Sequence, residues 1–164
     1  MKQIYLMRHG QAVEPGTPGF EDDERPLTRI GEKRVAEIAE GLRLLDLNLE
    51  RIVSSPLPCA QRTAEIVAEG LHARTILETD DALRSDRDAE SIRTWLGNRH
   101  EERIMLIGHN PTFSELLSLL ILNKTEPLIC DLRKGSVAAL CAEETAEYRL
   151  DWLARPRLVR RWLE

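Results

Sequence analysis

The stretch Ile4-Tyr5-Leu6-Met7-Arg8-His9-Gly10 sets a short apolar run directly before an arginine, a histidine and a glycine. Four consecutive apolar residues with a β-branched start predict a strand that is buried on both faces, as in a parallel sheet. The polar residues then emerge at the carboxyl end of that strand. Ligands bind at this edge of open α/β sheets, so the segment predicts both a fold class and the place of a site.

A second segment repeats this arrangement about a hundred residues later in the chain. Arg103-Ile104-Met105-Leu106-Ile107 predicts another buried strand, and Gly108-His109-Asn110-Pro111 follows it. Two of the four histidines of the chain, His9 and His109, therefore stand at predicted strand ends. Because parallel strands end at one edge of a sheet, we expect the two imidazoles to share one site.

The remaining pattern alternates short apolar runs with stretches of helical spacing. Further strands are predicted at 51–54, 75–77, 128–132, 136–140 and 148–153, and helices at 28–45, 55–71, 88–96 and 111–122. Such alternation predicts an α/β fold, a three-layer αβα sandwich with a mostly parallel central sheet. The last three strands lack long helices between them, so we expect antiparallel pairing at one edge.

Length and composition indicate an ordinary globular protein. The chain has 164 residues, which suits a single domain over residues 1–164. Its 23 basic and 28 acidic residues give a net charge of −5, which argues against a nucleic-acid or anionic-membrane binder. A local anion site needs only a few well-placed cations and stays open.

Cysteine usage and hydropathy point to the cytoplasm. Cys59, Cys130 and Cys141 are an odd number without CxxC spacing, which favours a reducing compartment over a disulfide framework. The apolar stretch Leu116–Leu122 is too short to span a bilayer. The apolar run Ile4–Met7 is shorter than the hydrophobic region of a secretory signal. We therefore expect a cytoplasmic protein.

His9 and His109 are the candidate catalytic residues, with Arg8 beside them. A neutral imidazole is a competent nucleophile at neutral pH, and Gly10 permits close backbone approach to an anion. A strand-end histidine can also just cap a backbone group, and Asn110-Pro111 can start a helix without any ligand. The pairing of both histidines with Arg8 at one sheet edge favours the catalytic interpretation.

Four blocks of sequence carry a family resemblance. They are Leu6-Met7-Arg8-His9-Gly10, Arg25-Pro26-Leu27-Thr28 with Gly31, Ser54-Ser55-Pro56-Leu57 with Ala60 and Thr63-Ala64, and Gly108-His109-Asn110-Pro111. In this order they resemble the histidine phosphatase superfamily, which is phosphoglycerate mutase-like in fold, and within it the SixA-like phosphohistidine phosphatases.

The resemblance implies a role for each matching residue. It implies that His9 is the phosphorylated nucleophile, that Arg8 binds the phosphate, and that His109 donates to the phosphoryl group. We expect Gly10 and Asn110 to contact the phosphate as well. The implied reaction needs no metal and no other cofactor, since arginine and histidine can neutralise the phosphoryl charge.

One position departs from the family pattern. Cys59 stands where an arginine usually follows Ser-Pro-x-x, while Arg62 lies three residues further on. Residues three apart share a helix face, so we expect Arg62 to supply the missing phosphate-binding cation. The spacing between Cys59 and Arg62 is too short for a cysteine phosphatase loop, and no third metal ligand stands at a ligand-like spacing from the two histidines.

The general acid is the least defined part of the predicted site. Asp86, Asp88 and Glu90 are candidates, although they also suit a solvated helix start. A phosphohistidine leaving group needs little acid help, so the leading hypothesis is a monomeric enzyme that removes phosphate from phosphohistidine on a protein, such as a histidine phosphotransfer-type domain. The alternatives are a small-molecule phosphomonoesterase of the same superfamily and a catalytically weak phosphate-binding module.

Overall fold

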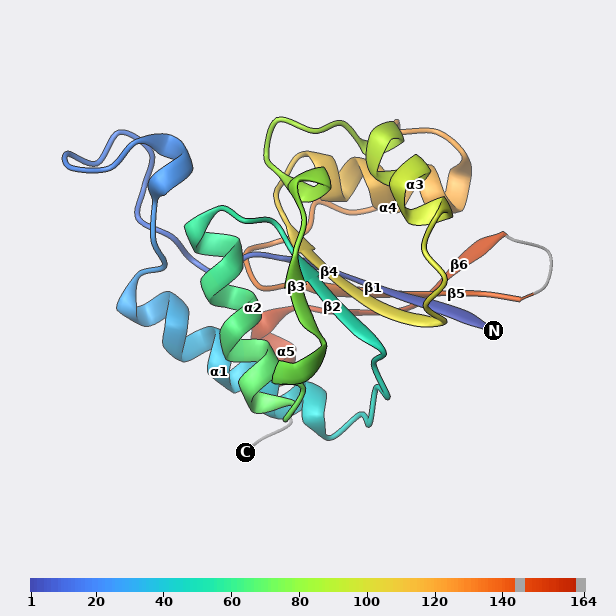
Figure 1. Cartoon of the computed structure of the whole chain (residues 1–164), viewed down its shortest axis with the longest axis horizontal. Coiled ribbons are helices and arrows are strands. Elements are labelled where there is room, and N and C mark those ends of the chain that lie inside the picture. Colours follow the sequence, from blue (N-terminus) through green and yellow to red (C-terminus); the bar gives the residue numbers. More distant parts are fainter. Residues whose placement is uncertain (144–146, 162–164) are drawn as a thin grey trace.

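A six-stranded sheet lies between two layers of helices in the computed structural model, which describes residues 1–143 and 147–161 (Figure 1). Its strand order is β3-β2-β4-β1-β5-β6. The parallel strands are β1 (Lys2–Arg8), β2 (Arg51–Ser54), β3 (Leu77–Thr79) and β4 (Arg103–Gly108), and the antiparallel edge is β5 (Val137–Ala142) and β6 (Tyr148–Ala154). The predicted α/β class with a mostly parallel central sheet is confirmed.

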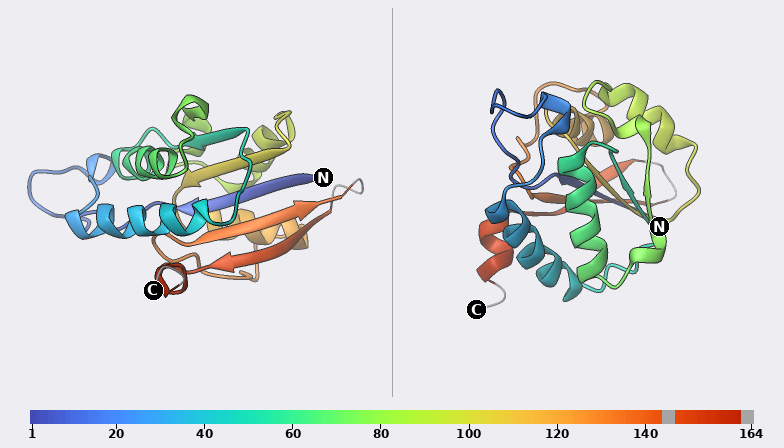
Figure 2. Two further views of the ribbon diagram at one scale, coloured as in Figure 1. Left: turned by 90° about the horizontal axis from the view of Figure 1, so that it is seen from below. Right: turned by 60° about the vertical axis from the view of Figure 1, so that its left-hand side comes forward.

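Each face of the sheet has its own apolar core. One face is covered by α1 (Arg29–Arg43), α2 (Pro58–Gly70) and the short α5 (Pro156–Arg161), and the other by α3 (Ala89–Gly97) and α4 (Thr112–Leu122) (Figure 2). Tyr5 and Met7 of β1 pack into the first core, whereas Ile4 and Leu6 pack into the second. This alternation is why the strand reads as a continuous apolar run. In the described ranges no helix combines the length and apolarity needed to cross a bilayer.

Three predicted elements differ from the structure. Residues 128–132 form no strand, because the amides of Ile129 and Leu132 donate to the hydroxyls of Ser118 and Ser114 on α4 instead of to a neighbouring strand. The predicted strand at 75–77 is a 3₁₀ turn, Arg74–Ile76, followed by β3. The second helix begins at Pro58 rather than at Ser55-Pro56, because Ser55 Oγ accepts from the Leu57 amide and turns the chain first. The pattern did not predict α5.

The register of β1 and β4 brings the two candidate histidines to one edge of the sheet. Arg8 is paired with Gly108, and the His9 amide donates to the Gly108 carbonyl at 3.0 Å. The next strand joins the same edge, since the Ser55 amide donates to the Ile107 carbonyl at 2.9 Å. Residues that are up to a hundred positions apart in sequence therefore meet where β1, β2 and β4 end.

The segment between β1 and α1 is held against the site by the start of α1. Thr28 caps α1 by accepting from the Gly31 amide, and the Thr28 amide donates to the Gln11 carbonyl at 2.9 Å. A Cβ atom on Gly31 would overlap the carbonyl oxygen of Gln11, which is backbone and cannot rotate away. Gly31 therefore permits the close approach of α1 to the chain beside His9.

We expect Gly31→Ala to lower the free energy of unfolding by about 1–3 kcal/mol, the usual effect of overpacking a closely packed contact. Gly97→Ala is the matched control, because a Cβ atom on Gly97 meets nothing within 4 Å. The control change should be neutral or stabilise by less than about 1 kcal/mol, since alanine is the better helix former. Urea denaturation of both variants measures the difference, and equal stabilities would contradict the assigned contact.

Candidate active site

His9 lies at the end of β1 and is only 6% exposed. Its Nδ1 lies 2.7 Å from the carbonyl oxygen of Gly10. Because a carbonyl can only accept, Nδ1 carries the hydrogen in the neutral ring. The Nε2 lone pair is then left free. The backbone of the next residue thus orients the imidazole and selects the nitrogen that can act as a nucleophile.

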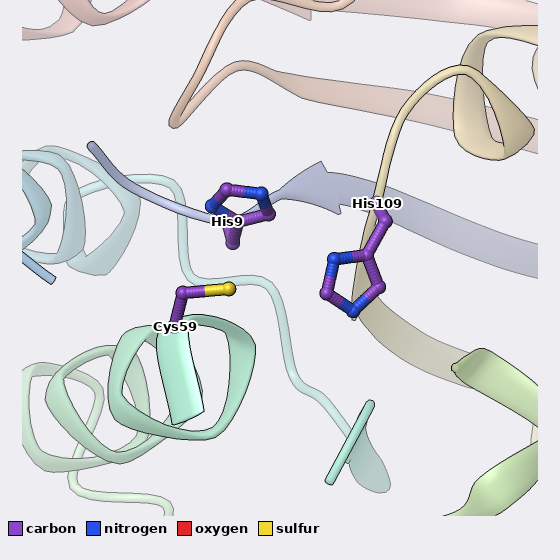
Figure 3. A group of neighbouring side chains, drawn as sticks. All are labelled: His9, Cys59 and His109. Atoms are coloured by element: carbon purple, nitrogen blue, oxygen red, sulfur yellow. The ribbon is translucent and has the colours of Figure 1, made fainter. Parts of the chain in front are cut away.

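His109 follows β4 and is 7% exposed. Its Nε2 lies 2.8 Å from the Ser55 hydroxyl, which itself accepts from the Leu57 amide at 3.3 Å. The Ser55 hydroxyl hydrogen is therefore available to His109 Nε2, which leaves Nδ1–H as a donor. The two imidazole centroids are 5.3 Å apart, and a nitrogen of each ring faces the space between them (Figure 3).

Both imidazoles are neutral at physiological pH. Burial lowers the pKa of His9 from 6.5 to about 3, and the nearby charges of His109, Arg8 and Lys134 act in the same direction. Burial also lowers the pKa of His109 to about 4, partly opposed by Asp23. A neutral His9 keeps the lone pair that a nucleophile requires.

Arg8 and Asn110 are tied to the same loop. Arg8 donates through Nη1 to the Leu132 carbonyl at 2.8 Å, while its buried Nε has no partner in the described part of the chain. Asn110 donates through Nδ2 to Asp131 at 2.9 Å and to the same Leu132 carbonyl at 3.1 Å. Arg8 therefore keeps donors for an anion. The side-chain amide of Asn110 has both of its Nδ2 hydrogens engaged in positioning this loop, so a phosphate contact by Asn110 would need its backbone amide.

Gly10 also differs from its predicted role. Its amide donates to Thr63 Oγ1 at 3.0 Å, and its carbonyl accepts from His9. Neither backbone group is free for a phosphate, although both lie beside the site. The glycine is required because a Cβ atom there would overlap the Val35 side chain. Gly10 thus orients His9 and links β1 to α2.

Arg62 is not brought to the histidines in the way that its helical spacing predicts. Its guanidinium is paired with Glu32 of α1 at 2.7 Å and with Glu65 at 3.1 Å, and its side chain is 45% exposed. The carboxylates of Glu32 and Glu65 neutralise the positive charge that the sequence predicted would bind phosphate. Among the described residues, Arg8, Arg25, Arg84 and Lys134 are cations whose charges act on the imidazoles.

Arg25 and Asp23 carry charges that act on the site, and neither was among the site residues predicted from the sequence. Arg25 donates to the carbonyls of Val13 at 2.9 Å and Asp22 at 3.0 Å, and its side chain is 20% exposed. Its positive charge, like the negative charge of Asp23, acts on both His109 and Cys59. Arg25 belongs to the block Arg25-Pro26-Leu27-Thr28, which carries the family resemblance, and this membership could have identified it as a candidate.

The three candidate general acids all lie on the surface around the start of α3. Asp88 caps this helix by accepting from the Ser91 amide at 2.7 Å. Glu90 pairs with Arg93 at 2.8 Å, and Asp86 lies 3.9 Å from Arg84 with a side chain that is 71% exposed. These placements suit the solvated helix start that the sequence also allowed.

Cys59 opens α2 and is buried beside the two histidines (Figure 3). Its Sγ atom and one nitrogen of each imidazole all lie within 4.8 Å of one another. Burial raises the pKa of the thiol, and the charge of Arg25 opposes this. These three side chains are a potential ligand set for a metal ion, which spacing along the sequence did not indicate.

Comparison with known proteins places this arrangement in a family. The family model for the histidine phosphatase superfamily (branch 1) matches residues 4–86. An uncharacterized protein of Picosynechococcus sp. is 30% identical over 144 residues, which cover 84% of each chain. Phosphohistidine phosphatase SixA of Escherichia coli is 25% identical over 157 residues, which cover 94% of each chain.

Solved structures show the same architecture. The protein histidine phosphatase SixA in complex with tungstate superposes with a TM-score of 0.82 at 25% identity, covering 94% of this chain and 97% of that one. A mycobacterial glucosyl-3-phosphoglycerate phosphatase with VO₃ superposes with a TM-score of 0.71 at 18% identity, covering 93% and 98%. The second likeness concerns the fold alone.

The buried neutral histidines predict a loss of stability in acid. Their folded pKa values, about 3 and about 4, lie below the value of 6.5 in the unfolded chain. Between these limits the unfolded chain binds more protons, so stability that is present above pH 6.5 is lost as the pH falls. From pH 7 to pH 5 each histidine should cost about 2 kcal/mol.

The measurement is the unfolding free energy at both pH values for the wild type and for the double variant His9→Gln, His109→Gln. Other titrating groups contribute to both proteins and cancel in the difference. The wild type should lose about 4 kcal/mol more than the variant. Equal losses would mean that the imidazoles are not held neutral.

Proposed function

This chain belongs to the histidine phosphatase superfamily (branch 1), and on that premise we propose that it removes phosphate from phosphohistidine on a protein. The observation that carries the proposal is the buried pair of neutral imidazoles beside Arg8, with His9 Nε2 left free by the Gly10 carbonyl. The similarity to E. coli SixA over 94% of both chains supports the same substrate class.

In the first step the Nε2 lone pair of His9 attacks phosphorus. The bond from phosphorus to the substrate imidazole breaks, and its electron pair returns to that nitrogen. If the substrate ring carries a proton on its other nitrogen, it leaves as neutral imidazole without help from an acid. Asp86, Asp88 and Glu90 lie exposed on the surface, and a reaction that needs no general acid is compatible with these positions.

In the second step water attacks the phosphoryl group on His9, the bond to Nε2 breaks, and inorganic phosphate leaves. Charge on the transferring group must be met by preorganised donors. His109, oriented by Ser55, supplies Nδ1–H, and Arg8 supplies the guanidinium donors that Leu132 does not use. We assign the further cation to Arg25, because Cys59 cannot carry positive charge and Arg62 is paired elsewhere.

The surroundings of the site favour an anionic partner. Arg8 and Gly10 also line a cleft of about 700 Å³ between β1, α1 and α5. Of the described residues that line it, six are basic and none is acidic; the six are Arg8, Arg34, Arg133, Lys134, Arg155 and Arg157. In a chain of net charge −5 such segregation supports contact with an anionic substrate surface.

His9→Ala should abolish turnover of a generic aryl phosphate and of phosphohistidine protein, because the variant has no nucleophile. His109→Ala should lower kcat about 10²–10³-fold, the usual cost of one preorganised donor. Rapid quench with a ³²P-labelled substrate should trap an acid-labile phosphoenzyme in the wild type and none in His9→Ala. Near-normal turnover by His9→Ala would refute the assignment.

The substrate class is tested on the wild type by comparing kcat/KM for a phosphohistidine protein with kcat/KM for sugar phosphates. A higher value on the protein supports the proposal, and the reverse order supports a small-molecule phosphomonoesterase. Negligible turnover of all substrates, with oxyanion binding retained, would indicate a phosphate-binding module.

Arg25→Ala and Arg62→Ala form a matched pair. Loss of one charge-assisted hydrogen bond costs about 1.5–3 kcal/mol, so Arg25→Ala should weaken inhibition by inorganic phosphate about 10–100-fold. Arg62→Ala should leave it unchanged, because that guanidinium is held by Glu32 and Glu65. Weaker phosphate inhibition in Arg62→Ala, with unchanged inhibition in Arg25→Ala, would contradict this assignment and show that Arg62 binds the phosphate.

A further inference from the structure

His9, Cys59 and His109 form a cluster whose chemistry the phosphatase reaction does not use in full. All three side chains are buried, and their ligand atoms lie within 4.8 Å of one another. We infer that these residues constitute a binding site for a thiophilic divalent cation, Zn²⁺, and that the ion inhibits the enzyme reversibly. The inference about binding is independent of the proposed function.

The two imidazoles are prepared as metal ligands by their partners. A metal-bound histidine commonly donates its second ring hydrogen to a carbonyl or another acceptor, which fixes the orientation of the ring. His9 already directs Nδ1 at the Gly10 carbonyl and leaves Nε2 free. His109 can donate from Nε2 to the Ser55 hydroxyl, which leaves the Nδ1 lone pair for the metal.

The geometry lies close to that of a tetrahedral zinc site. Zinc binds nitrogen at about 2.0–2.1 Å and sulfur at about 2.3 Å, so its ligand atoms lie roughly 3.3–3.8 Å apart. The three ligand atoms lie within 4.8 Å of one another, so side-chain movements of about 1–1.5 Å would bring them to this spacing. Three protein ligands leave the fourth position for water or an oxyanion, as in catalytic zinc sites.

Charge and ligand type select the metal. On binding, the Cys59 thiol loses its proton to solvent and the thiolate offsets one of the two positive charges. Asp23, whose charge acts on both Cys59 and His109, offsets part of the repulsion from Arg8 and Arg25. Imidazole and thiolate suit zinc, whereas Mg²⁺ prefers oxygen ligands.

Binding would compete with catalysis for the same electron pair. A zinc ion bound to His9 Nε2 occupies the lone pair that attacks phosphorus, so metal binding and phosphoryl transfer exclude one another. An arginine at position 59, the usual residue in the family pattern, offers no ligand atom and adds positive charge. Cys59 therefore makes this site sensitive to zinc.

The experiment titrates metal-free protein with Zn²⁺ by calorimetry and by competition with a chromophoric chelator, in the absence of substrate. We expect one equivalent to bind to the wild type. Cys59→Ala should weaken binding at least about 100-fold, since loss of even an outer-shell partner costs about 10–100-fold. Cys130→Ala and Cys141→Ala are matched controls that remove the other two free cysteines, and they should bind as the wild type does.

Co²⁺ provides a spectroscopic readout that a structural role of Cys59 would not reproduce. The wild type with Co²⁺ should show a sulfur-to-cobalt charge-transfer band and visible bands of tetrahedral intensity, and Cys59→Ser should lose the first. Circular dichroism and urea unfolding establish that each variant folds. Equal Zn²⁺ affinity in wild type and Cys59→Ala, or no stoichiometric binding to folded wild type, would overturn the inference.

Activity supplies a separate test. Turnover of an aryl phosphate should fall as Zn²⁺ fills the site and return on addition of EDTA. Should the wild type prove inactive, the binding and Co²⁺ measurements still decide the metal site, so failure of the proposed function and failure of this inference are distinguishable. Zinc bound without loss of turnover in an active enzyme would overturn the inhibitory part.

Discussion

The parallel register of β1 and β4 is the constraint on which the site depends. A single step in that register would turn every side chain of β1 to the opposite face, and the two apolar cores would exchange residues that they are built to hold. The hydrogen bond from the His9 amide to the Gly108 carbonyl extends the register beyond the strand. It thereby places His9 and His109 beside one another as a consequence of core packing.

Burial of the two imidazoles couples stability to chemistry. Desolvation keeps both rings neutral at physiological pH, which preserves the lone pair of His9 but leaves the folded state unable to accept protons that the unfolded chain accepts. Among the described residues each ring has one close hydrogen-bond partner, the Gly10 carbonyl for His9 and the Ser55 hydroxyl for His109. The hydroxyl can donate or accept, so His109 can present either a hydrogen or a lone pair to the pocket.

Cys59 changes what the pocket can bind. A thiol stands beside the two imidazoles, so this wall of the site supplies a ligand for soft metals and no positive charge. The remaining cations lie on other elements, with Arg8 held by the Leu132 carbonyl and Arg25 held by the segment between β1 and α1. The electrostatic balance of the site therefore depends on the loop before α1, which Gly31 allows to pack closely.

By itself the sequence determined the α/β class, most strands and helices, and the pairing of His9, Arg8 and His109, because apolar periodicity and strand-end placement are local signals. It misplaced the strand at 128–132, whose amides bond to two serines of α4. The sequence also predicted that Arg62, Gly10 and Asn110 bind phosphate, because it does not show that other groups of the protein already form hydrogen bonds with them. The tertiary structure alone decided those partners and the convergence of Cys59 with both histidines, because each depends on which atoms from distant segments come close together.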